Sequence, residues 1–278
     1  MPQELRKRHK SHARALKHLE ERFEWYADCI EMEPAPWRGR WLQRGEGDFR
    51  ELRLDLGCGK GAFALAEAQA NPDVLFVGLD YDKICIARAA QLAHEAGVSN
   101  LVFTLADAED IRELFGPGEL ARVHLNFSTP HPRKKHARER LTYVDELVKY
   151  REVLGADGEI RFKTDSPMFF DFSIAQFEMA AYDLTFTSRD LHADMPDLPQ
   201  SEYEQRLTAK GAKICALHAV KADRPITLEQ KVPLSLFDYL PEDLDAMEYV
   251  PYGMEGGVLN FRNRRAKEAA RAGSQLDS

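Results

Sequence analysis

Leu52-Arg-Leu-Asp55-Leu-Gly57-Cys-Gly59-Lys-Gly61 is the stretch that decides the fold. Its apolar start is typical of a buried strand, and a helical pattern begins directly behind the glycines. A strand, a glycine-rich turn and a helix N-terminus in succession indicate a nucleotide or nucleoside site, because a backbone without Cβ atoms can approach the ligand closely. The next apolar run ends in Asp80, at the distance expected of a carboxylate that binds a ribose. Together these residues predict a site for a cofactor that carries adenosine.

Asp55 indicates which cofactor this is. A carboxylate two residues before the first glycine repels a pyrophosphate but attracts a cationic amino-acid tail. Lys60 is not followed by the Ser or Thr that a phosphate-binding loop needs. The predicted cofactor is therefore S-adenosylmethionine, which carries a sulfonium and an ammonium group. A nicotinamide-dependent enzyme is the weaker functional alternative. The alternative without any function is an ordinary glycine turn between a strand and a helix.

Composition favours one soluble globular domain with some appended sequence. The chain has 278 residues, of which 44% are hydrophobic and 30% charged, enough for a sizeable core. No apolar run is long enough to span a bilayer, and no secretory leader is recognisable. Four cysteines without a C-x-x-C pair and scattered histidines argue against a disulfide framework and a bound metal. We therefore expect a cytoplasmic protein without a metal.

Basic residues are concentrated in two runs despite a net charge of −8. The first run lies in residues 5–18 and the second in residues 133–140. Nucleic-acid binding depends on such cations, because they neutralise phosphates. A solvated surface is the alternative for either run taken alone. Two runs in one chain favour a nucleic-acid partner. Trp37 and Trp41 are then candidates for stacking on bases, and the alternative is that they are packing anchors.

Apolar runs and helical patterns alternate along the chain. Strands are predicted at 52–56, 74–79, 101–105, 121–127, 159–163, 183–187 and 213–220, and helices at 60–70, 82–96, 108–115, 138–154 and 167–181. This alternation implies a parallel sheet, with the last two strands antiparallel at its edge. The ligand of such a sheet lies at the carboxyl ends of the strands. Asp107, after the third strand, is placed there to accept from an adenine amino group, and it can also cap the helix that begins near Ala108.

Several motifs resemble those of the bacterial tRNA (guanine-N7-)-methyltransferases. The most specific is Leu125-Asn126-Phe-Ser-Thr129-Pro-His131-Pro-Arg133-Lys-Lys-His136, which is similar to the family signature F-x-D-P-W-P-K-x-R-H. Four other segments occur along the chain in the same order as in the family. They are the basic start from Arg6 to Lys10, the Trp37–Trp41 segment, Phe162-Lys-Thr-Asp165, and Ser201-Glu-Tyr-Glu204 before Lys210-Gly211. The resemblance covers residues 6–220 and leaves 221–278 unmatched.

The resemblance implies an α/β protein with the class I S-adenosylmethionine-dependent methyltransferase fold, a seven-stranded mostly parallel sheet with helices on both faces. It implies methyl transfer from S-adenosylmethionine to N7 of a guanosine in the tRNA variable loop. The chain then divides into a basic N-terminal arm and helical lead-in (1–50), a methyltransferase domain (51–220) and a C-terminal extension of unassigned role (221–278). We expect tRNA as the partner of a monomer or homodimer without a membrane anchor.

Carried over position by position, the resemblance assigns roles to individual residues. The cofactor is expected to contact Asp55, Gly57, Gly59, Gly61, Asp80, Asp107, Ala108, Asn126 and Thr129. The RNA substrate is expected to contact Arg133, Asp165, Ser201, Glu202, Tyr203 and Glu204. Asp165 and Glu204 suit the N1–H and amino donors of guanine, and Thr129 and Asp165 are the expected catalytic residues. The alternatives are a helix N-cap for Asp165 and a solvated helix face for Glu204.

The chain departs from the family pattern in its signature. Thr129 stands where the family has aspartate, His131 replaces its tryptophan, Arg133 its lysine, and Ser201 its threonine. N7 of guanine has an in-plane lone pair and no proton, so the reaction needs no general base, and positioning can supply about 7–11 kcal/mol of the barrier. We therefore expect weakened rather than abolished catalysis. The alternative is a divergent paralogue that binds cofactor and RNA but has weak activity or methylates another acceptor.

Overall fold

The computed structural model describes residues 18–44 and 47–276, with side chains as far as Lys267. The predicted basic arm, from Arg6 to Lys17, lies outside the described residues. The chain divides into two compact units. The first comprises the residues up to Asn126 together with Lys149–Arg161, and the second comprises Phe127–Val148 and Phe162 onwards.

The strands follow the order β1-β4-β3-β2-β5-β6-β8-β7 in an eight-stranded sheet. The seven predicted strands are confirmed, and the eighth is the two-residue β1, which pairs parallel with β4. The prediction of an antiparallel pair at one edge is confirmed by β7 and β8. Their bounds are β1 (Ile30–Glu31), β2 (Glu51–Leu56), β3 (Val74–Asp80), β4 (Leu101–Leu105), β5 (Leu120–Asn126), β6 (Leu154–Thr164), β7 (Tyr182–Ser188) and β8 (Cys215–Lys221).

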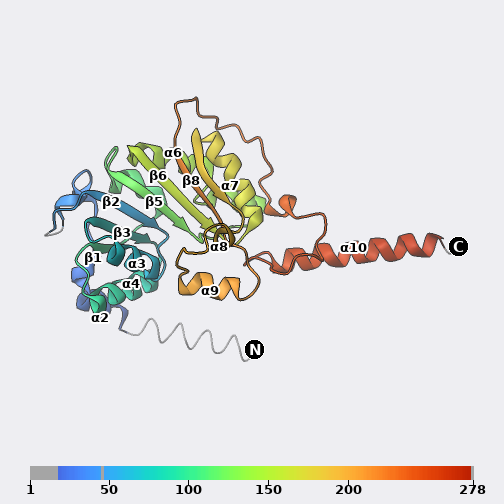
Figure 1. Ribbon diagram of the computed structural model, residues 1–278, viewed down its shortest axis with the longest axis horizontal. Helices are drawn as coiled ribbons and strands as arrows, with labels where there is room; N and C mark the ends of the chain where they lie inside the picture. The colour runs from blue at the N-terminus through green and yellow to red at the C-terminus, as the bar shows by residue number, and fades with distance from the viewer. Residues whose placement is uncertain (1–17, 45–46, 277–278) are drawn as a thin grey trace. The chain divides into compact units, whose positions relative to one another are not determined.

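Helices of the first unit pack on its parallel strands, with α3 against β3 and α4 against β4 (Figure 1). Asp82 begins α4 by accepting from the backbone N–H groups of Ile84 and Cys85, and Gly97 ends it in a left-handed conformation. The buried face of α4 consists of small and apolar residues that meet Phe76 and Phe103 of the strands. The helices before β5 are α2 (Leu19–Trp25), η1 (Ala27–Cys29), η2 (Ala35–Trp37), η3 (Trp41–Gln43), α3 (Ala62–Ala70), α4 (Lys83–Ala96), η4 (Ala108–Asp110) and α5 (Ile111–Leu114).

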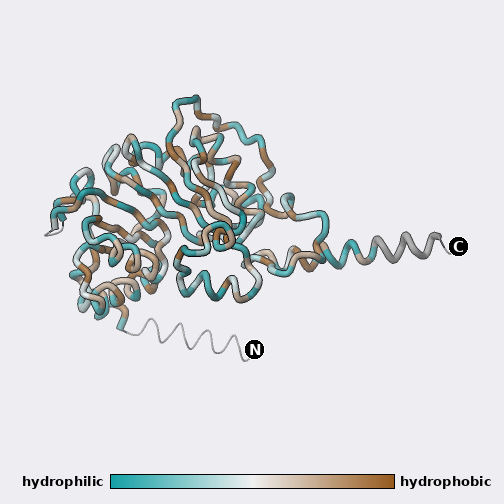
Figure 2. Tube along the Cα trace, viewed as in Figure 1, coloured by the Kyte–Doolittle hydropathy of each residue, from teal (hydrophilic) through white to brown (hydrophobic). Residues whose placement is uncertain are grey.

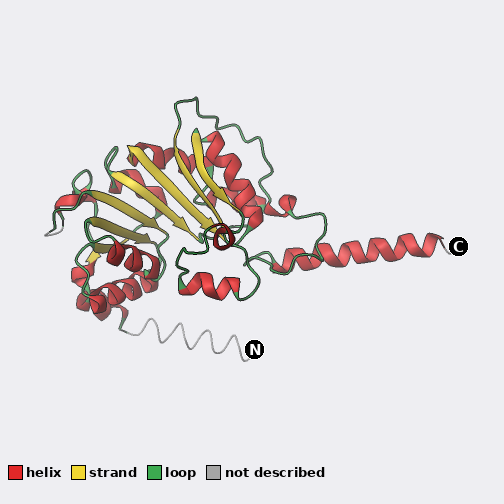
Figure 3. Ribbon diagram, viewed as in Figure 1, coloured by secondary structure: helices red, strands yellow, loops and turns green. Residues whose placement is uncertain are grey.

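The second unit contains the antiparallel pair and a long segment with little regular structure between β8 and α10 (Figure 3). The first turns of α10 include hydrophobic residues, and hydrophilic residues follow (Figure 2). The helices after β5 are η5 (Lys134–Glu139), α6 (Val144–Val153), α7 (Pro167–Met179), α8 (Leu191–Asp194), α9 (Glu202–Thr208), η6 (Leu236–Tyr239) and α10 (Glu255–Leu276).

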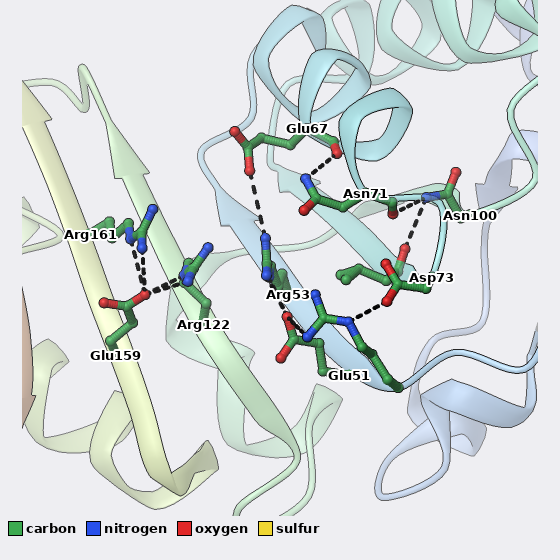
Figure 4. A network of polar contacts seen from close by, with 11 residues as sticks. Glu51, Arg53, Glu67, Asn71, Asp73, Asn100, Arg122, Glu159 and Arg161 are labelled. Carbon is green, nitrogen blue, oxygen red and sulfur yellow. Dashed lines mark hydrogen bonds and ion pairs between the residues drawn. The ribbon is translucent and has the colours of Figure 1, made fainter. Parts of the chain in front are cut away.

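A network of charged side chains joins the strands of the first unit away from their carboxyl ends (Figure 4). Arg53, only 6% exposed, pairs with Glu51 at 2.5 Å and with Glu67 at 3.8 Å. On the neighbouring strands, Glu159 accepts from both Arg122 and Arg161. Because a buried guanidinium is costly without a partner, these ion pairs make it possible for arginines to occupy strand positions.

All four cysteines are free thiols. Cys29, Cys58 and Cys215 are buried, and Cys85 is half-buried. Burial raises the pKa of Cys29 and Cys215 to about 12 and that of Cys85 to about 11, and it raises the pKa of Cys58 well above its usual range. The thiols are therefore protonated at neutral pH.

Candidate functional site

The glycine turn after β2 adopts a backbone that side chains disfavour. Gly57, Gly59 and Gly61 have φ angles of 75°, 54° and 77°, all left-handed. A Cβ atom at Gly61 would lie 2.7 Å from the Cβ atom of Ala89, so this glycine permits α4 to pack closely. A Cβ atom at Gly59 would meet nothing within 4 Å, so the turn leaves open space there. Such space beside a glycine backbone fits a ligand that approaches the main chain.

Asp55 is a buried carboxylate near the end of β2 that accepts a hydrogen bond from the Asn126 side chain. It is 2% exposed, and the Asn126 side chain donates to its Oδ1 atom at 3.3 Å. Burial raises the pKa of Asp55 to about 7, although the Asn126 hydrogen bond opposes the rise. A buried carboxylate that is poorly compensated favours a cationic ligand, because the ligand's charge offsets the cost of desolvation.

Asp80 ends β3 and is fixed by backbone donors. Its Oδ2 atom accepts from Gly59 N at 2.9 Å, and its Oδ1 atom accepts from Asp82 N at 2.9 Å. Burial raises the pKa of Asp80 above its ordinary value. These two hydrogen bonds tie the carboxylate to the glycine turn, so the carboxyl ends of β2 and β3 form one site.

Asp107 follows β4 and is exposed. Its Oδ1 atom accepts from Glu109 N at 3.1 Å, so it caps η4, which begins at Ala108. The capping role considered from the sequence is therefore confirmed, and a contact with adenine stays a prediction. The structure brings Asp55, Asp80, Asn126 and the three glycines together in the first unit, with Asp107 and Ala108 at the end of the adjacent strand.

The predicted acceptor residues belong to the second unit, beginning with the signature loop after β5. Phe127 and His131 have left-handed φ angles of 53° and 42°, and Thr129 between them is exposed. Left-handed backbone is unfavourable for residues other than glycine and persists where surrounding contacts enforce it. One such contact is the hydrogen bond from Phe127 N to Lys163 O, at 2.9 Å.

Arg140 supports this loop through hydrogen bonds of its guanidinium to backbone carbonyls. Its Nε atom donates to Pro130 O at 2.9 Å, and its Nη2 atom donates to His131 O at 2.7 Å and to Leu234 O at 2.9 Å. The guanidinium also lies 4.3 Å from the centre of the Phe172 ring. Burial lowers its pKa to about 10. The expectation that Arg140 contacts phosphate with the rest of its run is therefore wrong, whereas Arg133, Lys134 and Lys135 are exposed.

Glu204 is a buried structural residue in its present contacts. It is 3% exposed and forms a capping box with Ser201 at the start of α9. Its Oε2 atom accepts from Ser201 N at 2.8 Å, and its Oε1 atom accepts from Lys163 Nζ at 3.0 Å. Burial raises the pKa of Glu204, but the Lys163 ammonium and the Ser201 donors more than compensate, so its pKa lies below the ordinary value. The alternative of a solvated helix face is wrong, and the S-x-x-E spacing was the signal for this cap.

Asp165 lies just after β6, half-buried. Ser166 rather than Asp165 caps α7, so the N-cap alternative for Asp165 is wrong. The Tyr249 hydroxyl donates to the Oδ2 atom of Asp165. Tyr203 lies nearby, 45% exposed, with its ring 5.1 Å from that of Phe127, and Glu202 is exposed. Sequence reasoning missed Tyr249, because nothing in the sequence links two residues so far apart.

The two tryptophans considered for base stacking differ in burial, since Trp41 is buried and Trp37 is half-buried. Trp41 is fully buried, its ring lies 5.6 Å from that of Phe115, and its Nε1 atom donates to Leu114 O. Trp37 donates through Nε1 to Glu31 at 2.9 Å. The packing alternative for Trp41 is confirmed.

One group of possible metal ligands occurs among the described residues, away from the glycine turn. Asp28, Cys29 and His94 each place one ligand atom within 4.8 Å of the others. The Cys29 thiol is protonated, as burial raises its pKa, and Asp28 already pairs with His94 at 2.9 Å. Within the described part of the chain, no helix is both long and apolar enough to cross a membrane.

Comparisons with known proteins agree with this geometry. A family model described as "Putative methyltransferase" matches residues 50–217. Solved structures show the same fold. A 16S rRNA methyltransferase, KamB, has a TM-score of 0.50 and 18% identity over 63% of this chain and 89% of its own. The 16S rRNA (adenine(1408)-N(1))-methyltransferase of Catenulisporales acidiphilia, solved as a variant with the cosubstrate SAM, has a TM-score of 0.50 and 16% identity over 70% of this chain and 94% of its own.

Curated relatives are closer in sequence. The tRNA (guanine-N(7)-)-methyltransferase of Geobacillus kaustophilus is 36% identical over 200 residues, which cover 72% of this chain and 92% of the relative. The enzyme of the same name from Bacillus subtilis is 36% identical over 189 residues, which cover 68% of this chain and 88% of the relative. This chain therefore belongs to the tRNA (guanine-N(7)-)-methyltransferase family.

Proposed function

We propose that this protein transfers the methyl group of S-adenosylmethionine to N7 of guanosine in tRNA, in the variable loop. The observation that carries the proposal is the extent of the family match. Residues 50–217 include both the strand-end carboxylates and the acceptor motifs. The relative from Geobacillus kaustophilus matches over 200 residues, which are 72% of this chain. The proposal includes tRNA as the partner and the cytoplasm as the location. It also includes a protein that is a monomer or a homodimer.

The residues of the first unit fit the cofactor. Buried Asp55 favours a cation, Asp80 presents a carboxylate fixed by Gly59 N, and Gly59 leaves room above the main chain. S-adenosylmethionine supplies a methyl group already activated on sulfur. Asp55 would face its ammonium group, Asp80 its ribose and Asp107 its adenine, with Ala108, Asn126, Gly57 and Gly61 completing the contacts. Thr129 stays a proposed cofactor contact on the signature loop.

The residues of the second unit fit a guanine base. Asp165 would accept from the N1–H and amino groups of the ring edge opposite to N7. These hydrogen bonds strengthen as methylation makes the ring cationic, so Asp165 binds the transition state better than the ground state. The exposed ring of Tyr203 offers a stacking surface, which is how proteins commonly hold unpaired RNA bases. Because N7 carries no proton, Thr129 acts by position rather than as a base.

Supporting residues hold this arrangement in place. Glu204 and Ser201 fix the start of α9 through the capping box, and Lys163 links Glu204 to the end of β6. Exposed Arg133, followed by Lys134 and Lys135, would contact the phosphates. Residues 51–220 then form the methyltransferase domain, 1–50 a basic arm, and 221–278 an extension.

The proposal is tested by tritiated-methyl transfer to tRNA that lacks the modification, followed by nucleoside analysis. Label in 7-methylguanosine alone is expected. Asp55→Asn should abolish most of the transfer, whereas Asp73→Asn should preserve it, because Asp73 is an exposed carboxylate paired with Arg50 before β3. Label in another nucleoside would contradict the proposal.

A second function is favoured by Thr129 and His131, which replace an aspartate and a tryptophan of the family signature. A divergent paralogue would bind cofactor and RNA but have weak activity or methylate another acceptor. Calorimetric binding of the cofactor without label transfer to any tRNA nucleoside would favour this alternative.

A further inference from the structure

The extension beyond the family match is attached to the second unit at several points. The match ends at residue 217, and the segment from β8 to α10 is mostly loop (Figure 3). Leu236 N donates to Pro132 O at 2.9 Å, and Arg140 donates to Leu234 O at 2.9 Å. The first contact joins the extension to the signature loop, and the second joins it to the arginine that supports this loop. The extension is therefore part of the packing of the acceptor unit.

Tyr249 is the residue of the extension that reaches a proposed substrate residue. Its ring packs against a buried cluster, and its hydroxyl donates to the Oδ2 atom of Asp165. The cluster consists of Leu191, Leu207, Ala212, Ile214 and Ala216, with Phe127, Phe186 and Leu198 at its border. Packing fixes the ring, and the fixed ring fixes the position of the hydroxyl.

The hydroxyl is a permanent donor near neutral pH. Burial raises the pKa of Tyr249, and the hydrogen bond to Asp165 raises it further. The phenol therefore keeps its proton, and Asp165 can only accept from it. A carboxylate has about four acceptor positions on two oxygens. One hydrogen bond from Tyr249 leaves acceptor capacity for the two donors of a guanine edge.

We infer that Tyr249 is a positioning residue that holds the Asp165 carboxylate in the orientation needed to bind the guanine of the tRNA. The inference rests on the proposed function and deepens it, because it assigns to the extension a role in base recognition. A side-chain carboxylate rotates freely unless a partner fixes it, and a preorganised acceptor costs less to order when the substrate binds. The extension supplies that partner.

Tyr249→Phe tests the inference, because it keeps the ring in the cluster and removes only the hydroxyl. Losing a hydrogen bond to a charged group should raise the KM for tRNA about tenfold. The Kd for S-adenosylmethionine and the Tm should stay close to the wild-type values. Tyr252→Phe is the matched control, since Tyr252 is 71% exposed and lies three residues further along the chain, and it should change none of these quantities.

A double-mutant cycle with Asp165→Asn separates positioning from packing. If Tyr249 acts through Asp165, Tyr249→Phe should have little further effect on KM or on tRNA affinity when Asp165 is already replaced. Equal losses in both backgrounds would overturn the inference. A gain of activity in Tyr249→Phe would also overturn it, because the hydroxyl would then be blocking the carboxylate.

Failure of the proposed function gives a different result. If wild-type protein labels a nucleoside other than 7-methylguanosine, the function is wrong, and the same cycle on that nucleoside still measures the coupling of Tyr249 to Asp165. If no nucleoside is labelled, the cycle is measured by tRNA binding alone, and additive effects on the Kd would overturn the inference.

Discussion

The buried Asp55 carboxylate should make the binding of S-adenosylmethionine depend on pH. Burial raises its pKa to about 7, and the neutral form cannot attract the cationic tail of the cofactor. Bound cofactor stabilises the ionised form, so binding below about pH 7 releases a proton. Affinity should therefore fall as the pH is lowered through this pKa.

The size of the effect follows from the fraction of Asp55 that is ionised. With a pKa of about 7, that fraction is roughly 0.76 at about pH 7.5 and roughly 0.03 at about pH 5.5. If only the ionised form binds, the Kd should rise about 25-fold over this range, equivalent to about 1.9 kcal/mol. The raised pKa of Asp80 adds to the loss at the acidic end.

Isothermal titration calorimetry of the unliganded protein, repeated in buffers of different ionisation enthalpy, measures both the Kd and the protons released. Asp55→Asn should bind more weakly at about pH 7.5, and its Kd should change much less with pH. A wild-type Kd that is constant between about pH 5.5 and 7.5, or an unchanged pH dependence in Asp55→Asn, would refute the reasoning.

Three further predictions concern the acceptor unit. Thr129→Asp should raise the single-turnover methylation rate by about tenfold, and rescue from no detectable activity would contradict the expectation of weakened catalysis. Arg140→Lys should lower the free energy of unfolding by about 3 kcal/mol, because lysine cannot reproduce the planar set of donors to three carbonyls. Denaturant unfolding measures this loss, and Arg138→Lys, at an exposed position, should leave the free energy of unfolding unchanged. Replacing Lys134 and Lys135 together by alanine should lower the slope of log Kd against log salt for tRNA by about 2, and an unchanged slope would remove them from the phosphate contacts.

Periodicity and glycine spacing predicted most of the fold because each feature is local. The apolar run before Gly57, the Asp55 carboxylate near its end and the strand ending in Asp80 are contiguous patterns, and the structure places both carboxylates at the carboxyl ends of parallel strands. The two-residue β1 has no such pattern, because Ile30–Glu31 is too short for any period to be recognised. Its position depends on pairing with β4, which is distant in sequence.

The acceptor unit was less predictable because burial decides the roles of its charged residues. Arg140 and Arg133 have the same side chain and belong to one basic run, yet Arg140 is fully buried and Arg133 is exposed. Glu204 lies beside two exposed residues, and only the fold brings Lys163 to it. The hydrogen bond of Tyr249 to Asp165 spans 84 residues and depends on how the extension packs.

The protonated thiols make this chain suitable for site-specific labelling. Thiolates rather than thiols react with maleimides, and burial keeps the native cysteines protonated, with Cys29, Cys58 and Cys215 buried and Cys85 half-buried. A cysteine introduced at an exposed position, such as Asp73 in the first unit or Tyr252 in the second, should react well before them. A donor and an acceptor dye on such a pair would report the separation of the two units in solution, with and without cofactor and tRNA.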